Sequence, residues 1–190
     1  MKFDIMLAGV GGQGVLSLAA LIGRAAVAEG LHVKQSEVHG MAQRGGAVLS
    51  HLRLADHAIA SDLIPLGTAD LILSMEPLES LRYLAYLSPA GALVTAAEPF
   101  ANIPDYPDAA RIAADVRRLP GAVLVEAERL AREAGDVLSK NTVMVGAAAH
   151  RLPLKRESFD DAIRQTFGAK GERALQVNLA AFAAGWQAAA

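Results

Sequence analysis

The chain opens with a strand-like run that ends in Gly9-Val10-Gly11-Gly12-Gln13-Gly14, and this glycine-rich stretch decides the fold. It separates an apolar run over residues 3–8 from a second apolar run over residues 15–28. The first run has the length of a buried strand, and the second carries small and apolar residues at helical spacing. Glycines between a strand and a helix let the backbone approach a pyrophosphate, and the helix N-terminus favours an anion there. A strand followed by a glycine turn and a helix therefore predicts a phosphate-bearing ligand at residues 11–14.

The rest of the chain continues the alternation of apolar strand patterns with helix patterns. Further strands are predicted at 31–34, 47–54, 69–75, 92–96 and 122–125. Asp108 and Asn141 precede helical patterns and are residue types that favour the N-cap position. The helix after Asn141 is apolar all round, so we expect it to be buried. Strands that alternate with helices predict one Rossmann-like α/β domain over residues 1–190, with a doubly wound, mainly parallel sheet and helices on both faces.

Composition excludes several classes of function. The 190 residues include no cysteine, so the chain holds no iron–sulfur cluster, disulfide or thiol nucleophile of its own. A formal net charge of −2 provides no positive field for nucleic acid or an anionic membrane. No uninterrupted apolar stretch is long enough for a bilayer, and the N-terminus lacks a signal-peptide pattern, so a cytoplasmic protein is expected. The five histidines show no metal-ligand spacing, and no metal site is predicted.

A second polar stretch follows the predicted strand at 31–34. It reads Ser36-Glu37-Val38-His39-Gly40-Met41-Ala42-Gln43-Arg44-Gly45-Gly46 and has neither the helical nor the strand period. We expect it to be a loop beside the first glycine turn, at the sheet edge where α/β proteins bind ligands. Arg44 is a candidate phosphate contact, and His39 is the one histidine considered as a functional candidate.

The kind of nucleotide is predicted from the charges of this second stretch. Glu37 lies near the place where a dinucleotide site puts an acid for the ribose. Lys34 and Arg44 lie in the same region and favour an additional phosphate instead. This balance favours a phosphorylated adenosine over NAD.

Simpler explanations exist for each of these residues. The glycine turn is also compatible with a tight corner that binds no ligand. Arg44 is also compatible with a side chain that is simply solvated, and Asn141 with a role as a helix cap alone. The sequence has no Gly-x-Ser-x-Gly elbow, no P-loop lysine after the glycines and no clear acid–base pair of carboxylates. No catalytic residue is therefore assigned.

Several stretches resemble the gamma-type domain of the 2-oxoacid:ferredoxin oxidoreductases. They are the Gly11–Val15 turn, the Ser36–Gly46 stretch, Ser50-His51-Leu52-Arg53, the stretch from Asn141 to Ala147 and the stretch from Asn178 to Gly185. The resemblance covers nearly the whole chain. Its length and its His39–Gly46 segment are most similar to the beta subunits of the indolepyruvate type.

The resemblance implies an enzyme that oxidatively decarboxylates a 2-oxoacid, here an indolepyruvate or arylpyruvate, to an acyl-CoA. Thiamine diphosphate and [4Fe-4S] clusters are then expected on a larger partner subunit, with ferredoxin involved indirectly and the complex a hetero-oligomer. This chain would supply a subunit interface and the nucleotide wall of a shared coenzyme A site. The positions that match the family's coenzyme A-binding region are Gly11, Gly12, Gln13, Gly14, Arg44, Gly45 and Asn141.

Two other functions remain open on the sequence alone. A self-contained NAD(P)- or flavin-linked oxidoreductase would use the same glycine turn and would be active without a partner. A purely structural assembly subunit would leave the turn empty.

Overall fold

The computed structural model describes residues 1–39 and 45–190, apart from the side chain of His39. Its described strands form one six-stranded sheet in the order β2-β3-β1-β4-β5-β6. Strands β1, β4, β5 and β6 are parallel, whereas β3 runs antiparallel to both of its neighbours. The strand bounds are β1 Lys2–Val10, β2 His32–His39, β3 Ala47–Ala55, β4 Ala69–Ser74, β5 Leu87–Ala96 and β6 Val123–Val125. The predicted doubly wound, mainly parallel sheet is confirmed, with β3 as the exception.

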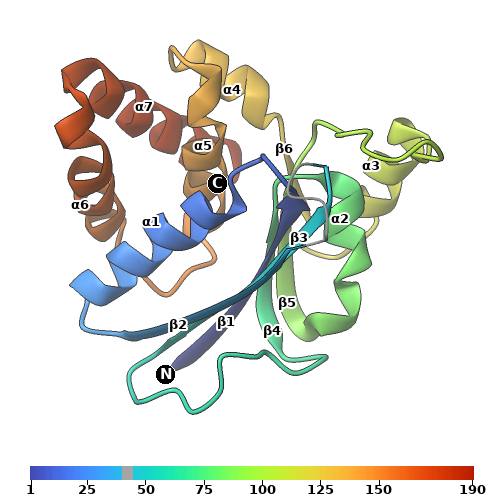
Figure 1. Ribbon diagram of the computed structural model, residues 1–190, viewed down its shortest axis with the longest axis horizontal. Coiled ribbons are helices and arrows are strands. Elements are labelled where there is room, and N and C mark those ends of the chain that lie inside the picture. Colours follow the sequence, from blue (N-terminus) through green and yellow to red (C-terminus); the bar gives the residue numbers. More distant parts are fainter. Residues whose placement is uncertain (40–44) are drawn as a thin grey trace.

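Helices cover both faces of the sheet (Figure 1). Successive strand residues point to opposite faces, so β1 sends Ile5 and Leu7 into the larger core and Met6 into the smaller one. The larger core lies under α1 Val15–Ala28, α4 Ala127–Glu133, α5 Lys140–Ala149, α6 Arg156–Phe167 and α7 Glu172–Ala188. The smaller core lies on the side of α2 Pro77–Arg82 and α3 Ala109–Arg117. Short 3₁₀ helices are η1 Leu84–Tyr86, η2 Val137–Ser139 and η3 Gly168–Lys170.

Strand β2 is longer than the sequence predicts. The predicted strand ended at residue 34, but β2 continues to His39, and Ser36 and Val38 pair with His51 and Leu49 of β3. The prediction of a loop is therefore wrong for residues 36–39, and residues 40–44 of the predicted loop lie outside the described part of the chain. The polar residues of β2 are compatible with a strand because β2 lies at the edge of the sheet. There, pairing with β3 outweighs the weak intrinsic preference of these residues for a strand.

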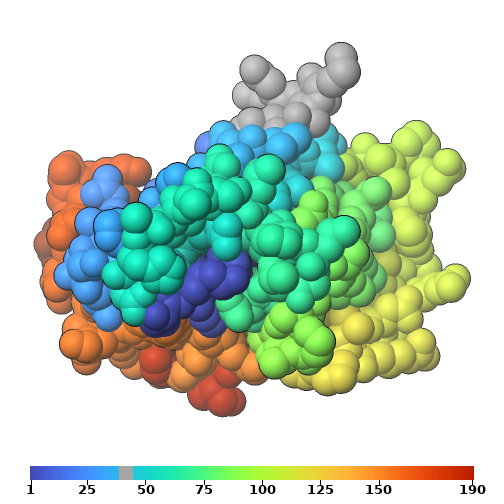
Figure 2. Space-filling view, turned by 90° about the horizontal axis from the view of Figure 1, so that it is seen from below, coloured from blue at the N-terminus to red at the C-terminus, as the bar shows by residue number. Residues whose placement is uncertain are grey.

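A loop over residues 56–68 covers part of the sheet on the side of the smaller core, where its Ile64 is buried. His51 Nδ1 accepts a hydrogen bond from the Ile64 N–H at 3.1 Å, which requires a neutral imidazole, and burial lowers the pKa of His51. Arg53 donates to the carbonyl oxygens of Ser61 and Leu63 and forms an ion pair with buried Asp4 at 2.8 Å. Figure 2 shows this teal segment beside the dark-blue start of β1. The His51 and Arg53 positions thus serve the fold, at the edge opposite the glycine turn.

Helix α5 forms the centre of the helical layer, as its apolar sequence predicts. All its residues from Thr142 to Ala149 are buried. It crosses α7 at Gly146 and Gly185, and Thr142 Oγ1 donates to Asn178 Oδ1 of α7 at 2.6 Å. The absence of side chains at the two glycines lets the helix backbones touch, which fixes the position of α5 relative to α7.

Candidate functional site

The glycine turn lies between the carboxyl end of β1 and the start of α1. Gly12 and Gly14 have φ values of +100° and +77°, a region that glycine adopts without strain. Gly14 occupies the N-cap position of α1, and no side chain caps this helix. A Cβ on Gly12 would meet no atom of the described residues within 4 Å. The turn therefore presents uncapped N–H groups of α1 beside open space, an arrangement that suits an anion.

The second glycine stretch packs directly against this turn. The Gly11 N–H donates to the Gly46 carbonyl at 2.8 Å, and the Gly11 carbonyl accepts from the Gly45 N–H at 3.2 Å. The Gly45 carbonyl accepts in turn from Asn102 Nδ2 at 2.7 Å. The predicted proximity of the two glycine stretches is confirmed. Arg44 lies outside the described residues, so its role as a phosphate contact stays a prediction.

Gln13 serves the turn itself. Its Oε1 accepts from the Val10 N–H at 2.8 Å and its Nε2 donates to the Met75 carbonyl at 3.2 Å. The side chain is only 7 % exposed. Gln13 thus fixes the turn to the carboxyl end of β4, and its amide groups are already used in doing so.

Asn141 reaches the same turn from a distant part of the chain. Its Nδ2 donates to the Gly14 carbonyl at 2.9 Å. The prediction that Asn141 caps its helix is wrong, because α5 begins at Lys140 with Ser139 at the N-cap position. Asp136 Oδ1 accepts from the Leu138 N–H at 2.9 Å and turns the chain through η2, so the helix starts one residue before Asn141. The side chain of Asn141 is therefore available to bind Gly14.

Lys140 is a residue of this edge that the sequence analysis missed. It lines a recess of about 70 Å³ together with Gln13, Met75 and Phe100. The carboxylates of Glu98 and Glu128 line the recess too. Lys140 is half-buried and forms no ion pair within residues 1–39 and 45–190. Its position directly before Asn141 is the only signal in the sequence that points to it.

Both carboxylates of this recess have other partners. Glu98 Oε1 accepts from the Glu128 N–H at 2.8 Å, and Glu128 Oε1 pairs with Arg132 at 2.6 Å. Lys140, which has no ion-pair partner in the described part of the chain, lies at the start of α5 in the same recess as Gln13 of the glycine turn. A half-buried ammonium at the start of a helix, with no carboxylate partner among the described residues, favours a bound anion.

The loop over residues 97–107 is anchored to the same edge. Buried Glu76 accepts through Oε1 from the Tyr106 hydroxyl and, at 3.3 Å, from the Phe100 N–H. Burial and this hydrogen bond raise the pKa of the Tyr106 hydroxyl. The loop presents Phe100 and Ile103 to solvent with 44 % and 37 % of their surfaces exposed. It therefore forms an apolar rim next to the recess of Lys140.

These groups fit a phosphate-bearing ligand by their chemistry, because they combine backbone N–H groups that no side chain caps, glycines without a Cβ, and a lysine with no ion-pair partner among the described residues. In the part of the chain that the structure describes, no three histidine or acidic side chains gather as metal ligands would. Nor does any described helix combine the length and apolar character needed to span a bilayer. The arrangement of the described groups suits binding and assembly.

Comparison with known proteins agrees with this arrangement. The family model of pyruvate ferredoxin/flavodoxin oxidoreductase matches residues 4–188. The indolepyruvate oxidoreductase subunit IorB of Pyrococcus horikoshii is 39 % identical over 198 aligned residues, which cover 99 % of this chain and 96 % of that protein.

Solved structures share the fold at lower identity. The pyruvate oxidoreductase subunit PORC of Thermotoga maritima superposes with a TM-score of 0.73 at 22 % identity, covering 98 % of this chain and 96 % of that one. The 2-oxoglutarate:ferredoxin oxidoreductase of Magnetococcus marinus, solved with 2-oxoglutarate, coenzyme A and succinyl-CoA bound, superposes with a TM-score of 0.77 at 23 % identity. This match covers 99 % of our chain but only 31 % of the Magnetococcus chain. The chain therefore belongs to the pyruvate ferredoxin/flavodoxin oxidoreductase family, as a gamma-type domain of the 2-oxoacid:ferredoxin oxidoreductases.

Proposed function

We propose that this chain forms the nucleotide wall of a coenzyme A site in an indolepyruvate or arylpyruvate:ferredoxin oxidoreductase. The observation that carries the proposal is one sheet edge that holds the uncapped start of α1, Gly12 and Lys140. Among the described residues, no atom lies where a Cβ of Gly12 would be, and Lys140, which shares a recess with Gln13 of the turn, has no ion-pair partner. The 39 % identical IorB protein supports the indolepyruvate class, and the Magnetococcus relative was solved with coenzyme A bound. The diphosphate of coenzyme A is the ligand group that this edge suits.

The remaining chemistry belongs to a larger partner subunit in this proposal. The sequence has no cysteine, so iron–sulfur clusters need ligands from another chain. Thiamine diphosphate would lie there as well, and the partner would decarboxylate the 2-oxoacid and pass electrons to ferredoxin. Our chain would bind and orient the acyl acceptor, so the complex is a hetero-oligomer that makes an acyl-CoA.

Removal of either cation should weaken coenzyme A binding in the reconstituted complex. We expect Lys140→Ala and Arg44→Ala each to raise the KM for coenzyme A by about tenfold or more, the effect of losing one charge-assisted contact. The KM for the 2-oxoacid should stay unchanged, because that substrate is expected on the partner. Steady-state kinetics with each substrate varied in turn measure both values.

A matched control is Arg117→Ala, an exposed arginine on α3 away from this edge. It should leave both KM values unchanged. A coenzyme A KM that neither Lys140→Ala nor Arg44→Ala moves would favour a purely structural subunit. Turnover of an NAD(P) or flavin substrate by the isolated chain would favour a self-contained oxidoreductase instead.

A further inference from the structure

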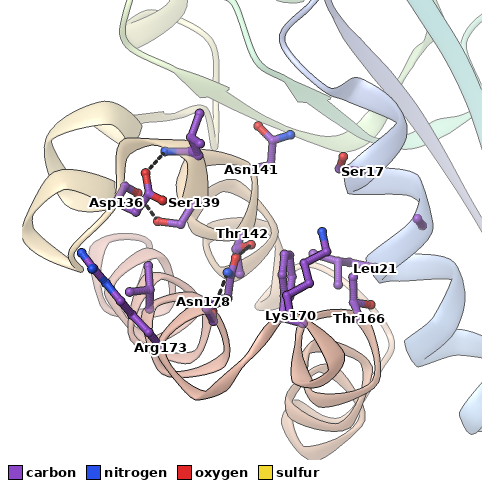
Figure 3. Close-up of a pocket in the computed structure, with 15 residues that line it drawn as sticks. Ser17, Leu21, Asp136, Ser139, Asn141, Thr142, Thr166, Lys170, Arg173 and Asn178 are labelled. Carbon is purple, nitrogen blue, oxygen red and sulfur yellow. Dashed lines mark hydrogen bonds between the residues drawn. The ribbon is translucent and has the colours of Figure 1, made fainter.

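A cavity of about 580 Å³ lies in the helical layer, between α1, the start of α5, η3 and α7 (Figure 3). Ser17 and Asn141 both line it. The Ser17 N–H and Asn141 Nδ2 donate to the same Gly14 carbonyl, each at 2.9 Å. This cavity therefore adjoins the glycine turn and belongs to the site described above. The loop over residues 56–68 lies on the other face of the sheet, against the smaller core, and is a separate feature.

This loop, which we call the strap, is held on the sheet by two side chains of β3. Ile64 of the strap is only 3 % exposed and belongs to the smaller core. Its N–H donates to His51 Nδ1 at 3.1 Å. Arg53 donates to two carbonyl oxygens of the strap, each at 2.9 Å, and one of them is that of Leu63. Neighbouring positions on one face of β3 therefore hold the strap, one as an acceptor and the other as a donor.

The peptide group between Leu63 and Ile64 is thus held at both of its ends. Its carbonyl oxygen accepts from Arg53, and its N–H donates to His51. The second contact requires an Nδ1 without a proton, so it exists only while the imidazole is neutral. A proton on Nδ1 would place two donors against each other and would charge a residue that is only 5 % exposed. The contact with Arg53 has no such limit, because the guanidinium keeps its charge throughout the range in which histidine titrates.

The surroundings of His51 favour its neutral form. Burial is the largest influence and lowers the pKa of His51, and the positive charge of Arg53 acts in the same direction. The negative charges of Asp62 and Asp4 act against it, but Asp4 is already paired with Arg53 at 2.8 Å. Tyr86 lies edge-on to the imidazole with the ring centres 5.7 Å apart, and the β2 residue opposite His51 is a serine. His51 is therefore an acceptor near neutral pH and loses this role on acidification.

We propose that the strap is an element of this fold that acid releases, with His51 as the contact that senses the proton. Protonation of His51 breaks its hydrogen bond with the Ile64 N–H, and the carbonyl contacts of Arg53 keep the chain tethered beside it. Ile64 then leaves the smaller core, whose other members include Met6 and Ile72, so an apolar part of the sheet becomes accessible. The strap and the glycine turn are separate, so this switch does not depend on the proposed coenzyme A function.

Hydrogen exchange at the Ile64 amide, followed by NMR on the 190-residue chain, tests the switch. In the open strap His51 is solvated and titrates near the ordinary histidine pKa of about 6.5. In the closed strap its pKa is lower, so the open form binds a proton that the closed form does not. Below the ordinary value, each pH unit should therefore reduce the protection factor of this amide by about tenfold. The decrease should stop once the pH reaches the pKa of the closed form.

His51→Asn is the variant that separates the proton from the contact. The asparagine side-chain oxygen can accept from the Ile64 N–H as Nδ1 does, but it does not titrate. The variant should keep the Ile64 amide protected and remove the pH dependence of its protection factor. His32→Asn is the matched control, because His32 is an exposed histidine of β2 that is not among the groups that shift the pKa of His51. It should keep the dependence of wild type.

Two further measurements on wild type keep the test decisive even if His51→Asn fails to fold. An NMR titration of the His51 ring should give a midpoint below the ordinary value, at the pH where the decrease in protection stops. The Gly67 amide is an internal reference, because its N–H donates to the Ala85 carbonyl at 2.9 Å and this contact has no titratable partner. A protection factor at Ile64 that does not change with pH, or a His51 midpoint at or above the ordinary value, would overturn the proposal. An equal decrease at Gly67 would also overturn it, since acid would then open the whole domain and not the strap.

Discussion

Replacing Gly185 by alanine should destabilise the fold by about 3 kcal/mol or more, the upper part of the range for overpacked cores. A Cβ at this position would lie 1.9 Å from the Val143 carbonyl oxygen and 3.0 Å from the Ala147 nitrogen. Both atoms belong to the backbone of α5, which cannot move aside as a side chain can. The clash is reciprocal, because a Cβ on Gly146 would lie 2.2 Å from the Phe182 carbonyl oxygen. Helices α5 and α7 would have to separate.

The midpoint of urea unfolding, followed by circular dichroism, measures this change. Gly168→Ala is the control, since its Cβ would meet no atom of the described residues within 4 Å and its backbone is already helical. It should be neutral or stabilising by up to about 1 kcal/mol. A Gly185→Ala protein as stable as wild type would show that the two helices do not touch as described.

Replacing Gly14 by alanine should cost about 2–4 kcal/mol, the sum of left-handed strain and a lost, partly buried hydrogen bond from Asn141. The φ value of +77° disfavours any Cβ, and this one would lie 2.3 Å from Asn141 Nδ2. The loss of stability should be smaller in the Gly14→Ala, Asn141→Ala double variant than the sum of the single losses, because the second change removes the clash. Urea unfolding of the four proteins gives this cycle.

Gly30→Ala is the control that measures the backbone strain of Gly14→Ala without the contact to Asn141. Gly30 has φ +78°, nearly the value of Gly14, and its Cβ would meet no atom of the described residues within 4 Å. It should therefore show the cost of the backbone conformation alone, about 1–2 kcal/mol. Equal losses for Gly30→Ala and Gly14→Ala would contradict the contact between Asn141 and the glycine turn.

The sequence predicts the features of this fold that depend on neighbouring residues. The strand, turn and helix from residue 3 to residue 28 follow from local hydrophobic pattern and glycine chemistry. Asp108 caps α3 as its residue type predicts, accepting from the Arg111 N–H at 2.8 Å. The burial of α5 follows from its uniformly apolar surface. In each case the cause lies within one or two helical turns of the residue.

Features that depend on distant residues were predicted less well. Strand β2 looks like a loop from residue 36 because its pairing with β3 is invisible in a polar local sequence. Asn141 has the residue type of a cap, but its partner is the Gly14 carbonyl, 127 residues away. Lys140 has no local motif, and its importance appears only where α5 meets the glycine turn. The sequence therefore predicts only part of the candidate site. Its glycines form a local motif, whereas the side chains around them are brought there by the fold.

The central claim is that coenzyme A occupies the glycine turn, and calorimetry on the reconstituted complex tests it most directly. Gly12→Ala and Gly30→Ala are matched, since both place a Cβ at positive φ where it meets no atom of the described residues within 4 Å, and only Gly12 faces the proposed ligand. We predict that Gly12→Ala raises the Kd for coenzyme A by about tenfold or more, through the loss of close backbone contact with the diphosphate, while Gly30→Ala leaves it unchanged. An unchanged Kd in Gly12→Ala, in a complex that assembles normally, would contradict the account.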